Sequence, residues 1–184
     1  MTQSALARTG RIGLAALAVV TLATGCAGGD AAAGCTTNLT FTDLASNAQV
    51  VLIHGAAVSF LDGAAYTAFA SDQPVDASEI TLTTAPTPGE GATLASLFVT
   101  RFNANAEQVA PIPVGTVVSP SGGDGELVFG VVVQRKNVNM GNSMDASGTL
   151  TVNQIGDSLC FDIDYKDTEK QMVGTFQSPS VALI

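Results

Sequence analysis

Residues 158–166 of this chain read Ser-Leu-Cys-Phe-Asp-Ile-Asp-Tyr-Lys, and they decide its fold class. Apolar and polar side chains alternate along the whole stretch, which is the period of a β-strand with one face in a core and the other in water. The apolar face consists of Leu159, Phe161, Ile163 and Tyr165, and the opposite face of Cys160, Asp162, Asp164 and Lys166. The segment therefore predicts a half-buried strand with a defined core face.

Other segments repeat this pattern at short intervals. Residues Leu150 to Ile155 alternate in the same way, and Gly156-Asp157 between the two runs predicts a hairpin turn. The stretch from Glu126 to Arg135 is apolar on both faces and rich in β-branched residues, which predicts a central strand covered on both sides. Short strands separated by Gly- and Pro-containing turns predict an all-β fold, either an antiparallel β-sandwich or a β-barrel.

Two segments leave room for helix. The alanines between Ala56 and Ala70 favour helix, but Val58 and Phe60 also alternate there, and Gly63 weakens a helix. We therefore expect at most one or two short helices, in this segment or in residues 43–49.

The first residues have the pattern of an export signal. Arg8 and Arg11 precede an apolar run from Ile12 to Ala23, and small residues then lead to Cys26. A positive segment, an apolar run of this length and small residues before a cleavage point are typical of a secretory signal, and the run is too short to span a bilayer as a helix.

The residues Ala23-Thr24-Gly25-Cys26 resemble the end of a bacterial lipoprotein signal, in which a small residue precedes a cysteine that receives a diacylglyceryl group and becomes the first mature residue. The family usually has leucine where this chain has Ala23, so ordinary secretory cleavage is the alternative. The resemblance implies an exported protein anchored by lipid on Cys26 to a bacterial cell membrane or outer membrane. It divides the chain into a removed signal peptide (1–25), a lipidated cysteine with a flexible tether (26–34) and a single β-domain (35–184).

Once Cys26 is assigned to lipid, two cysteines remain. Cys35 and Cys160 would then lie in a compartment where disulfides persist, so we expect a bond between them, with two separate thiols as the alternative. Because Cys160 belongs to the polar face of its strand, the bond is expected to run over the outside of the sheet.

The charge of the chain is strongly negative. Two of its seven basic residues, Arg8 and Arg11, lie in the signal segment, which leaves five against sixteen acidic residues. Binding to nucleic-acid phosphates depends on clustered Lys and Arg, so we expect no nucleic-acid partner.

Few residues point to chemistry, and no catalytic residue or resident cofactor is assigned. The single histidine, His54, is more typical of a strand or sheet rim than of a triad, since no Gly-x-Ser-x-Gly motif accompanies it. Asp162, Asp164 and Asp167 follow one another on a strand and its turn, where grouped oxygens could hold Ca²⁺ weakly. The alternative for these carboxylates is a solvated strand face.

The closing pattern is similar to that of uncharacterised β-rich envelope lipoproteins, in residues 148–152, 161–164 and 173–176. This resemblance implies a membrane-anchored lipoprotein whose non-catalytic β-domain binds an envelope protein or polymer or has an accessory structural role. One alternative is a carrier whose barrel encloses a lipid or small apolar ligand. A second is an envelope hydrolase that uses His54 or the pair Asp162 and Asp164.

Overall fold

The computed structural model describes residues 35–81, 84–102, 110–135, 138–143 and 145–183. The predicted signal peptide, residues 1–25, and the predicted lipidated cysteine and tether, residues 26–34, lie outside the described residues. Within the described part the fold is all-β, as the alternation of side chains predicted. None of the helices in that part is long and apolar enough to cross a membrane.

One curled, mixed sheet contains the eleven strands of the described residues. The strands are β1 (Asn38–Asp43), β2 (Ala48–Leu52), β3 (His54–Phe60), β4 (Ala65–Ser71), β5 (Thr93–Arg101), β6 (Val117–Val118), β7 (Leu127–Arg135), β8 (Val138–Met140), β9 (Ser147–Gln154), β10 (Ser158–Lys166) and β11 (Lys170–Ala182). There are two short 3-10 helices in the described residues: η1 (Leu61–Gly63) joins β3 to β4, and η2 (Ala77–Glu79) lies between β4 and β5. The strand order is β6-β9-β10-β11-β3-β4-β5-β7-β8, with β1 beside β11 and β2 beside β1.

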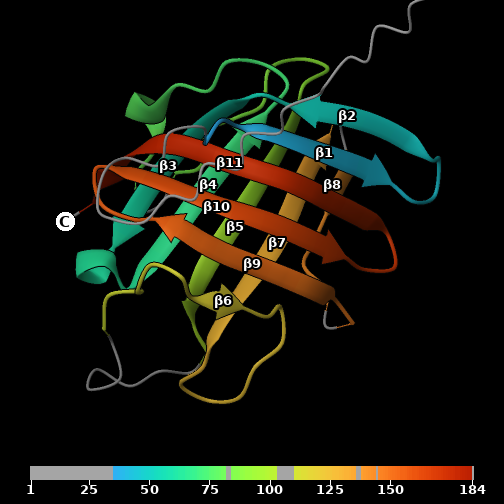
Figure 1. Ribbon diagram of the computed structural model, residues 1–184. Helices are drawn as coiled ribbons and strands as arrows, with labels where there is room; N and C mark the ends of the chain where they lie inside the picture. The colour runs from blue at the N-terminus through green and yellow to red at the C-terminus, as the bar shows by residue number, and fades with distance from the viewer. Residues whose placement is uncertain (1–34, 82–83, 103–109, 136–137, 144, 184) are drawn as a thin grey trace, which may run out of the picture.

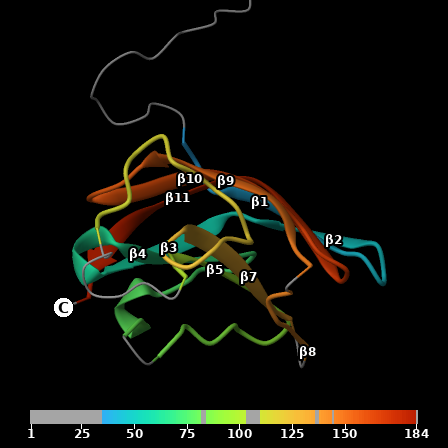
Figure 2. The ribbon, with the colours of Figure 1, turned by 90° about the horizontal axis from the view of Figure 1, so that it is seen from below.

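The sheet folds over into two layers (Figures 1 and 2). Strands β1, β2, β9 and β10 lie in one layer and β3, β4, β5, β7 and β8 in the other, while the long strand β11 belongs to both. One edge of β11 pairs with β10, and its other edge pairs first with β1 and then, at Ser180–Ala182, with β3. The β11–β3 pairing is parallel, whereas the other strand pairings are antiparallel, so the sheet departs from the predicted antiparallel pattern at this crossing between layers.

A short contact also links the layers on the opposite side. Strand β6 pairs with β9, and the backbone N–H of Phe129 on β7 donates to the carbonyl of Ser119 just after β6, at 3.1 Å. The architecture therefore lies between the sandwich and the barrel that the sequence predicted.

The main core lies between the layers. The largest of its fully buried side chains are Phe41, Phe129, Phe161, Tyr165 and Phe176. The rings of Phe161 and Phe176 are stacked with their centroids 4.9 Å apart. On β10 the apolar positions are buried and Asp162, Asp164 and Lys166 are exposed, which confirms the core face predicted for this strand.

A second, smaller core covers the outer face of β3, β4 and β5. Buried Ile80, which follows η2, packs there with Val58, Phe69 and Leu94. The segment between β4 and β5 therefore lies across this face and shields it from water.

Four local expectations can be compared with the observed strands. Strand β7 is buried on both faces from Val128 to Val131, as predicted, but it lies next to the end of the sheet order rather than at its centre. Residues 56–70 form β3 and β4 joined by η1, so alternation prevailed over alanine helix propensity. Residues 44–47 form a turn between β1 and β2, and Gly156-Asp157 connects β9 to β10 as predicted.

The expected disulfide is present. Cys35 and Cys160 are bonded with their Cα atoms 6.4 Å apart, across 125 residues of sequence. Cys160 alternates along β10 with core-facing Leu159 and Phe161, yet it is fully buried. Residues 35–37 account for this burial, because Cys35 Sγ lies 3.7 Å from the Phe176 carbonyl and Thr37 bonds to Gln177 on the neighbouring strand.

Gly174 marks the tightest approach between β1 and β11. Its φ is 137°, and an added Cβ would overlap the carbonyl oxygen of Asn38 on β1. We predict that Gly174→Ala lowers the free energy of unfolding by at least about 2 kcal/mol, because the clash must be relieved by separating the two strands. Urea unfolding followed by circular dichroism measures this change.

The control for this prediction is Gly141→Ala, where the added Cβ meets no atom within 4 Å. We expect this substitution to change the free energy of unfolding by less than about 0.5 kcal/mol. Equal stability of the two variants would contradict the role assigned to Gly174.

Candidate functional site

An open groove of about 850 Å³ lies at one end of the two-layered sheet. Its walls come from segments far apart in sequence: the end of β3, η1, Tyr66 on β4, Pro111, the β9–β10 turn and the end of β11. The lining residues are Ser59, Phe60, Leu61, Asp62, Gly63, Tyr66, Pro111, Ile155, Gly156, Ala182 and Leu183. The volume falls within the usual range for small-molecule sites.

The turn between β3 and β4 forms one wall of the groove in an unusual conformation. Leu61, Asp62 and Gly63 have φ values of 51°, 52° and 86°, so all three residues are left-handed. Only the last is a glycine, and a residue with a Cβ loses roughly 1–2 kcal/mol in this conformation. The turn leaves the Leu61 side chain 63% exposed at the groove. An apolar side chain held in water by a strained backbone is a feature that function explains better than stability.

Hydrogen bonds hold the groove walls in place. The N–H of Ala64 donates to the carbonyl of Leu61 at 3.1 Å, and the N–H of Ile112 donates to the carbonyl of Gly63 at 3.0 Å. On the other wall the N–H of Leu183 donates to the carbonyl of Ser59 at 3.0 Å. The groove is therefore preformed in its backbone.

The chemistry of the groove is apolar with a few polar atoms. Phe60, Leu61, Ile155 and Leu183 supply hydrocarbon surface. Burial raises the pKa of the Tyr66 hydroxyl above its usual value of 10.0, so this hydroxyl stays neutral. The arrangement can bind an apolar group.

The disulfide lies close to this groove. Cys160 is four residues beyond Gly156, a groove residue, so the extended chain between them spans at most about 14 Å. Cys35, the first described residue, is bonded to Cys160. The chain that precedes residue 35 therefore joins the domain near the groove.

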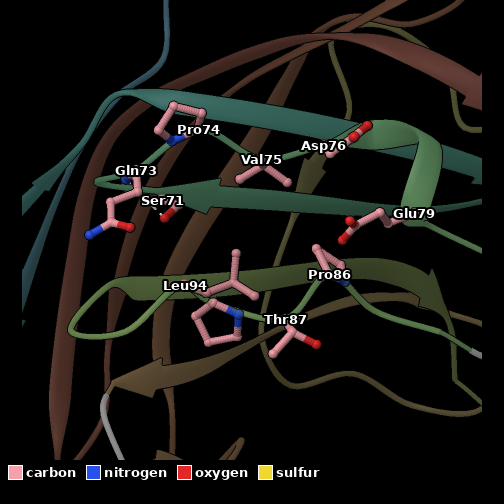
Figure 3. A pocket seen from close by; sticks show the side chains of 11 residues that line it. Ser71, Gln73, Pro74, Val75, Asp76, Glu79, Pro86, Thr87 and Leu94 are labelled. Carbon is pink, nitrogen blue, oxygen red and sulfur yellow. Dashed lines mark hydrogen bonds between the residues drawn. The ribbon is translucent and has the colours of Figure 1, made fainter.

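A smaller pocket of about 270 Å³ lies between residues 71–79 and 86–94 (Figure 3). Asp76 and Glu79 lie at one end of it, and Val75 and Leu94 lie along it. Asp76 accepts hydrogen bonds from the backbone N–H and the hydroxyl of Ser78, which hold its pKa below the usual value. That carboxylate caps η2, and the pocket offers less apolar surface than the groove.

The described residues also include a buried polar cluster where β10 turns into β11. Lys170 Nζ donates to Asp167 Oδ2 and to the Gly141 carbonyl, both at 2.6 Å. The Tyr165 hydroxyl donates to the same Asp167 oxygen at 2.8 Å and lies 3.3 Å from Oδ1 of Asn142. Lys170 and Tyr165 are fully buried, and Asp167 nearly so. The cluster ties the turn to residues 141–142 and does not open into the groove.

The environment of this cluster shifts two pKa values. Burial acts to raise the pKa of Asp167, but hydrogen bonds from the Lys170 side chain and from the N–H groups of Glu169 and Lys170 outweigh it, so the pKa falls below 3.8. Burial and the neighbouring carboxylate of Asp167 raise the pKa of Tyr165. At neutral pH the cluster therefore contains an ionised aspartate and a neutral tyrosine.

The structure does not bring the predicted calcium ligands together. Asp162 and Asp164 lie on the exposed face of β10, where Asp162 accepts hydrogen bonds from Asn153 Nδ2 at 2.8 Å and Thr175 Oγ1 at 2.6 Å. Asp167 turns into the core because Lys170 binds it there. Within the described residues, no three His, Cys, Asp or Glu side chains are grouped so that they could hold a metal ion.

The remaining sequence candidates are also apart. His54 is the first residue of β3, partly exposed and opposite Ser71, on the other layer from Asp162. Cys26 lies outside the described residues. Sequence reasoning missed the groove, and its only local signal was the turn at residues 61–63. No protein-family model, curated protein or solved structure matches the chain.

The ion pair between Asp167 and Lys170 makes stability depend on pH. The pKa of Asp167 is lower in the folded state than in the unfolded state, where it is about 3.9. The stabilisation by its carboxylate is therefore complete above the unfolded pKa and is lost as pH falls through the folded pKa. We predict that the stability of the Asp167→Asn variant falls less steeply below pH 4 than that of the wild type. At pH 7 the free energy of unfolding of the variant should be about 3–5 kcal/mol lower, because Lys170 is left buried without its partner.

Denaturant unfolding between pH 3 and pH 7 measures both effects. Asp164→Asn, an exposed position on β10, is the matched control and should keep the wild-type profile. The double variant Asp167→Asn with Lys170→Met should recover part of the lost stability, since no unpaired charge remains. An Asp167→Asn variant with wild-type stability at pH 7 would refute the role of the pair.

Proposed function

We propose that the chain is an exported lipoprotein, anchored through lipid on Cys26, whose non-catalytic β-domain binds a lipid acyl chain in the groove at the end of the sheet. The observation that carries this proposal is the groove itself, which is open, preformed and lined mainly by hydrocarbon. Burying an acyl chain is favourable by about 0.8 kcal/mol for each CH₂ group, so a groove of this kind needs few polar contacts to bind one.

The attachment of the domain supports an acyl chain as the ligand. Cys35 is bonded to Cys160, and eight residues separate Cys26 from Cys35 along the chain. As a random coil, a chain of eight residues has a root-mean-square reach of roughly 16 Å. This is similar to the upper limit of about 14 Å for the extended chain between Gly156 and Cys160. A lipid on Cys26 would thus hold this end of the domain beside the membrane, where acyl chains are the abundant apolar ligand.

The alternatives fit the geometry less well. A carrier that encloses its ligand needs an internal cavity, whereas the space between the layers is filled by side chains such as Phe41, Phe161 and Phe176. A hydrolase that uses His54, or the pair Asp162 and Asp164, gains no support from the groove, because none of these residues lines it. An apolar segment of an envelope protein is the alternative occupant of the groove, and the binding experiment below separates it from a lipid.

We predict that the chain from residue 26 onward, carrying Cys26→Ser, binds the neutral fluorescent probe N-phenyl-1-naphthylamine. Palmitoyl-lysophosphatidylcholine, added below its critical micelle concentration, should displace the probe. Leu61→Asp should lower the affinity for both ligands at least tenfold, because it places a charge at the groove. Aspartate is also among the residues that best tolerate a positive φ, so the fold should be kept. Fluorescence titration measures the affinities, and circular dichroism checks the fold.

The matched control is Val114→Asp, a residue 60% exposed and outside the groove. It should leave both affinities within about twofold of those of the Cys26→Ser parent. Probe binding without displacement by the lysolipid would favour a protein segment as the occupant. Equal binding by the Leu61→Asp and Val114→Asp variants would exclude the groove as the site.

The lipid anchor is tested separately. We predict that the mature chain begins at Cys26, carries at least a diacylglyceryl group and fractionates with membranes, because two acyl chains suffice for stable anchoring. Mass spectrometry of the amino-terminal peptide gives the modification. Cys26→Ser should move the protein to the soluble fraction, and an unmodified terminus beyond residue 26 would contradict the anchor without bearing on the groove.

A further inference from the structure

The groove contains a polar group that the fold leaves unpaired, the hydroxyl of Tyr66 on β4. Tyr66 is only 5% exposed, yet it lines the groove. Among the described residues its hydroxyl has no hydrogen-bond partner, and burial alone raises its pKa. Tyr165, by contrast, donates its hydroxyl hydrogen to Asp167 at 2.8 Å. A buried tyrosine hydroxyl usually has a partner, so the one at Tyr66 points to a ligand.

The position of this hydroxyl is defined by η1. A Cβ added at Gly63 would lie 3.0 Å from the hydroxyl oxygen of Tyr66 and 3.9 Å from Cβ of Pro111. Gly63 and Pro111 also line the groove. The hydroxyl therefore lies at the groove, where Gly63, which has no side chain, leaves space beside it.

Hydrocarbon alone is a poor match for this wall. Water can bond to the Tyr66 hydroxyl in the free domain, and a bound acyl chain displaces that water. A ligand without polar atoms would leave the hydroxyl buried and unpaired, whereas a ligand with an acceptor at this point would restore the hydrogen bond. A phenolic hydroxyl is a better donor than acceptor, because its oxygen lone pair is delocalised into the ring, so the matching group is a carbonyl oxygen.

The charge of the groove selects against an anion. The described lining residues include the carboxylate of Asp62 but no lysine, arginine or histidine, and the remaining polar side chain, Ser59, is uncharged. Asp62 is exposed and directly precedes Gly63, beside the Tyr66 hydroxyl. A ligand carboxylate at the hydroxyl would therefore meet a like charge without a compensating cation. An ester carbonyl carries no charge and avoids this repulsion.

We propose that the groove selects acyl esters over free fatty acids. The hydrocarbon of the ester lies along Phe60, Leu61 and Leu183, and its carbonyl oxygen accepts a hydrogen bond from the Tyr66 hydroxyl. Asp62 disfavours the carboxylate of a fatty acid at the same point. Ester selection rests on the proposed binding of an acyl chain in the groove and adds the functional group that the chain must carry.

Three ligands with chains of equal length test this selection. They are 1-monolauroylglycerol, 1-O-dodecylglycerol, in which CH₂ replaces the carbonyl, and laurate, each used below the concentration at which it aggregates. Each ligand displaces N-phenyl-1-naphthylamine from the chain that begins at residue 26 and carries Cys26→Ser. At neutral pH we expect the ester to bind at least about fivefold more tightly than the ether and at least about tenfold more tightly than laurate.

Tyr66→Phe should abolish the preference for the ester over the ether and leave the affinity for N-phenyl-1-naphthylamine within about twofold of the parent's. Because the hydroxyl has no partner within the described residues, this variant should also keep the stability of the parent. The matched control is Thr67→Val, which removes a hydroxyl from the opposite face of β4 and should keep the preference. An ester preference that survives Tyr66→Phe would overturn the role of the hydroxyl.

Asp62→Asn should bring the affinity for laurate at least about threefold closer to that for the ester, without changing the affinity for the ester. Asparagine tolerates the positive φ of this position, so the turn should be kept. Asp164→Asn removes the same charge from an exposed position outside the groove and should leave laurate binding as in the parent. An unchanged ratio in Asp62→Asn would overturn selection by charge.

Two outcomes separate ester selection from acyl-chain binding itself. Equal affinity of the parent for the ester, the ether and laurate, with the probe bound, would overturn ester selection alone. A parent that binds neither the probe nor any of these ligands would refute the groove as an acyl-chain site and ester selection with it. Circular dichroism confirms that each variant is folded.

Discussion

The fold depends on the thirteen residues of β11, which both layers share. One edge of this strand pairs with β10, and the other pairs with β1 and then, in parallel, with β3. Because the backbone groups of a buried strand must be satisfied, the layers can separate only by breaking this strand's hydrogen bonds. Phe176 lies midway along β11, stacks on Phe161 and contacts Cys35 through its carbonyl. The disulfide therefore joins the segment before β1 to β10 across β11.

The first residue of β11 is also the least expected one, a fully buried lysine. Removing an ammonium group from water is expensive, and Lys170 is tolerated because it has a carboxylate and a carbonyl as partners. The Asp167 carboxylate accepts further hydrogen bonds from the Tyr165 hydroxyl and from two backbone N–H groups, so both of its oxygens have hydrogen-bond donors. The cluster fixes one end of the sheet, whereas the other end of β11 forms a wall of the groove.

The sequence predicted the parts of the fold that depend on a local period. The strand at residues 158–166 was predicted from alternation, because one buried face imposes that alternation, and its hairpin from Gly156-Asp157 between two alternating runs. Alternation also continued from Gln49 to His54, yet the chain passes from one layer to the other at Ile53, which no local pattern marks. The inward position of Asp167 depends on Lys170, and the groove depends on segments as distant as Phe60 and Leu183. Concavity and side-chain pairing of this kind are properties of the tertiary arrangement.

The turn at residues 61–63 connects the energetics of the fold with its proposed use. A glycine or asparagine at position 61 would adopt the observed φ of 51° with less strain, and a polar residue there would suit its 63% exposure. The chain instead places leucine where both backbone strain and hydration oppose it. A bound acyl chain would cover that side chain and remove the unfavourable hydration of Leu61, whereas the backbone conformation of the turn would stay as it is. The exposure of Leu61 is therefore better explained by a ligand-binding wall than by any contact that the described residues make.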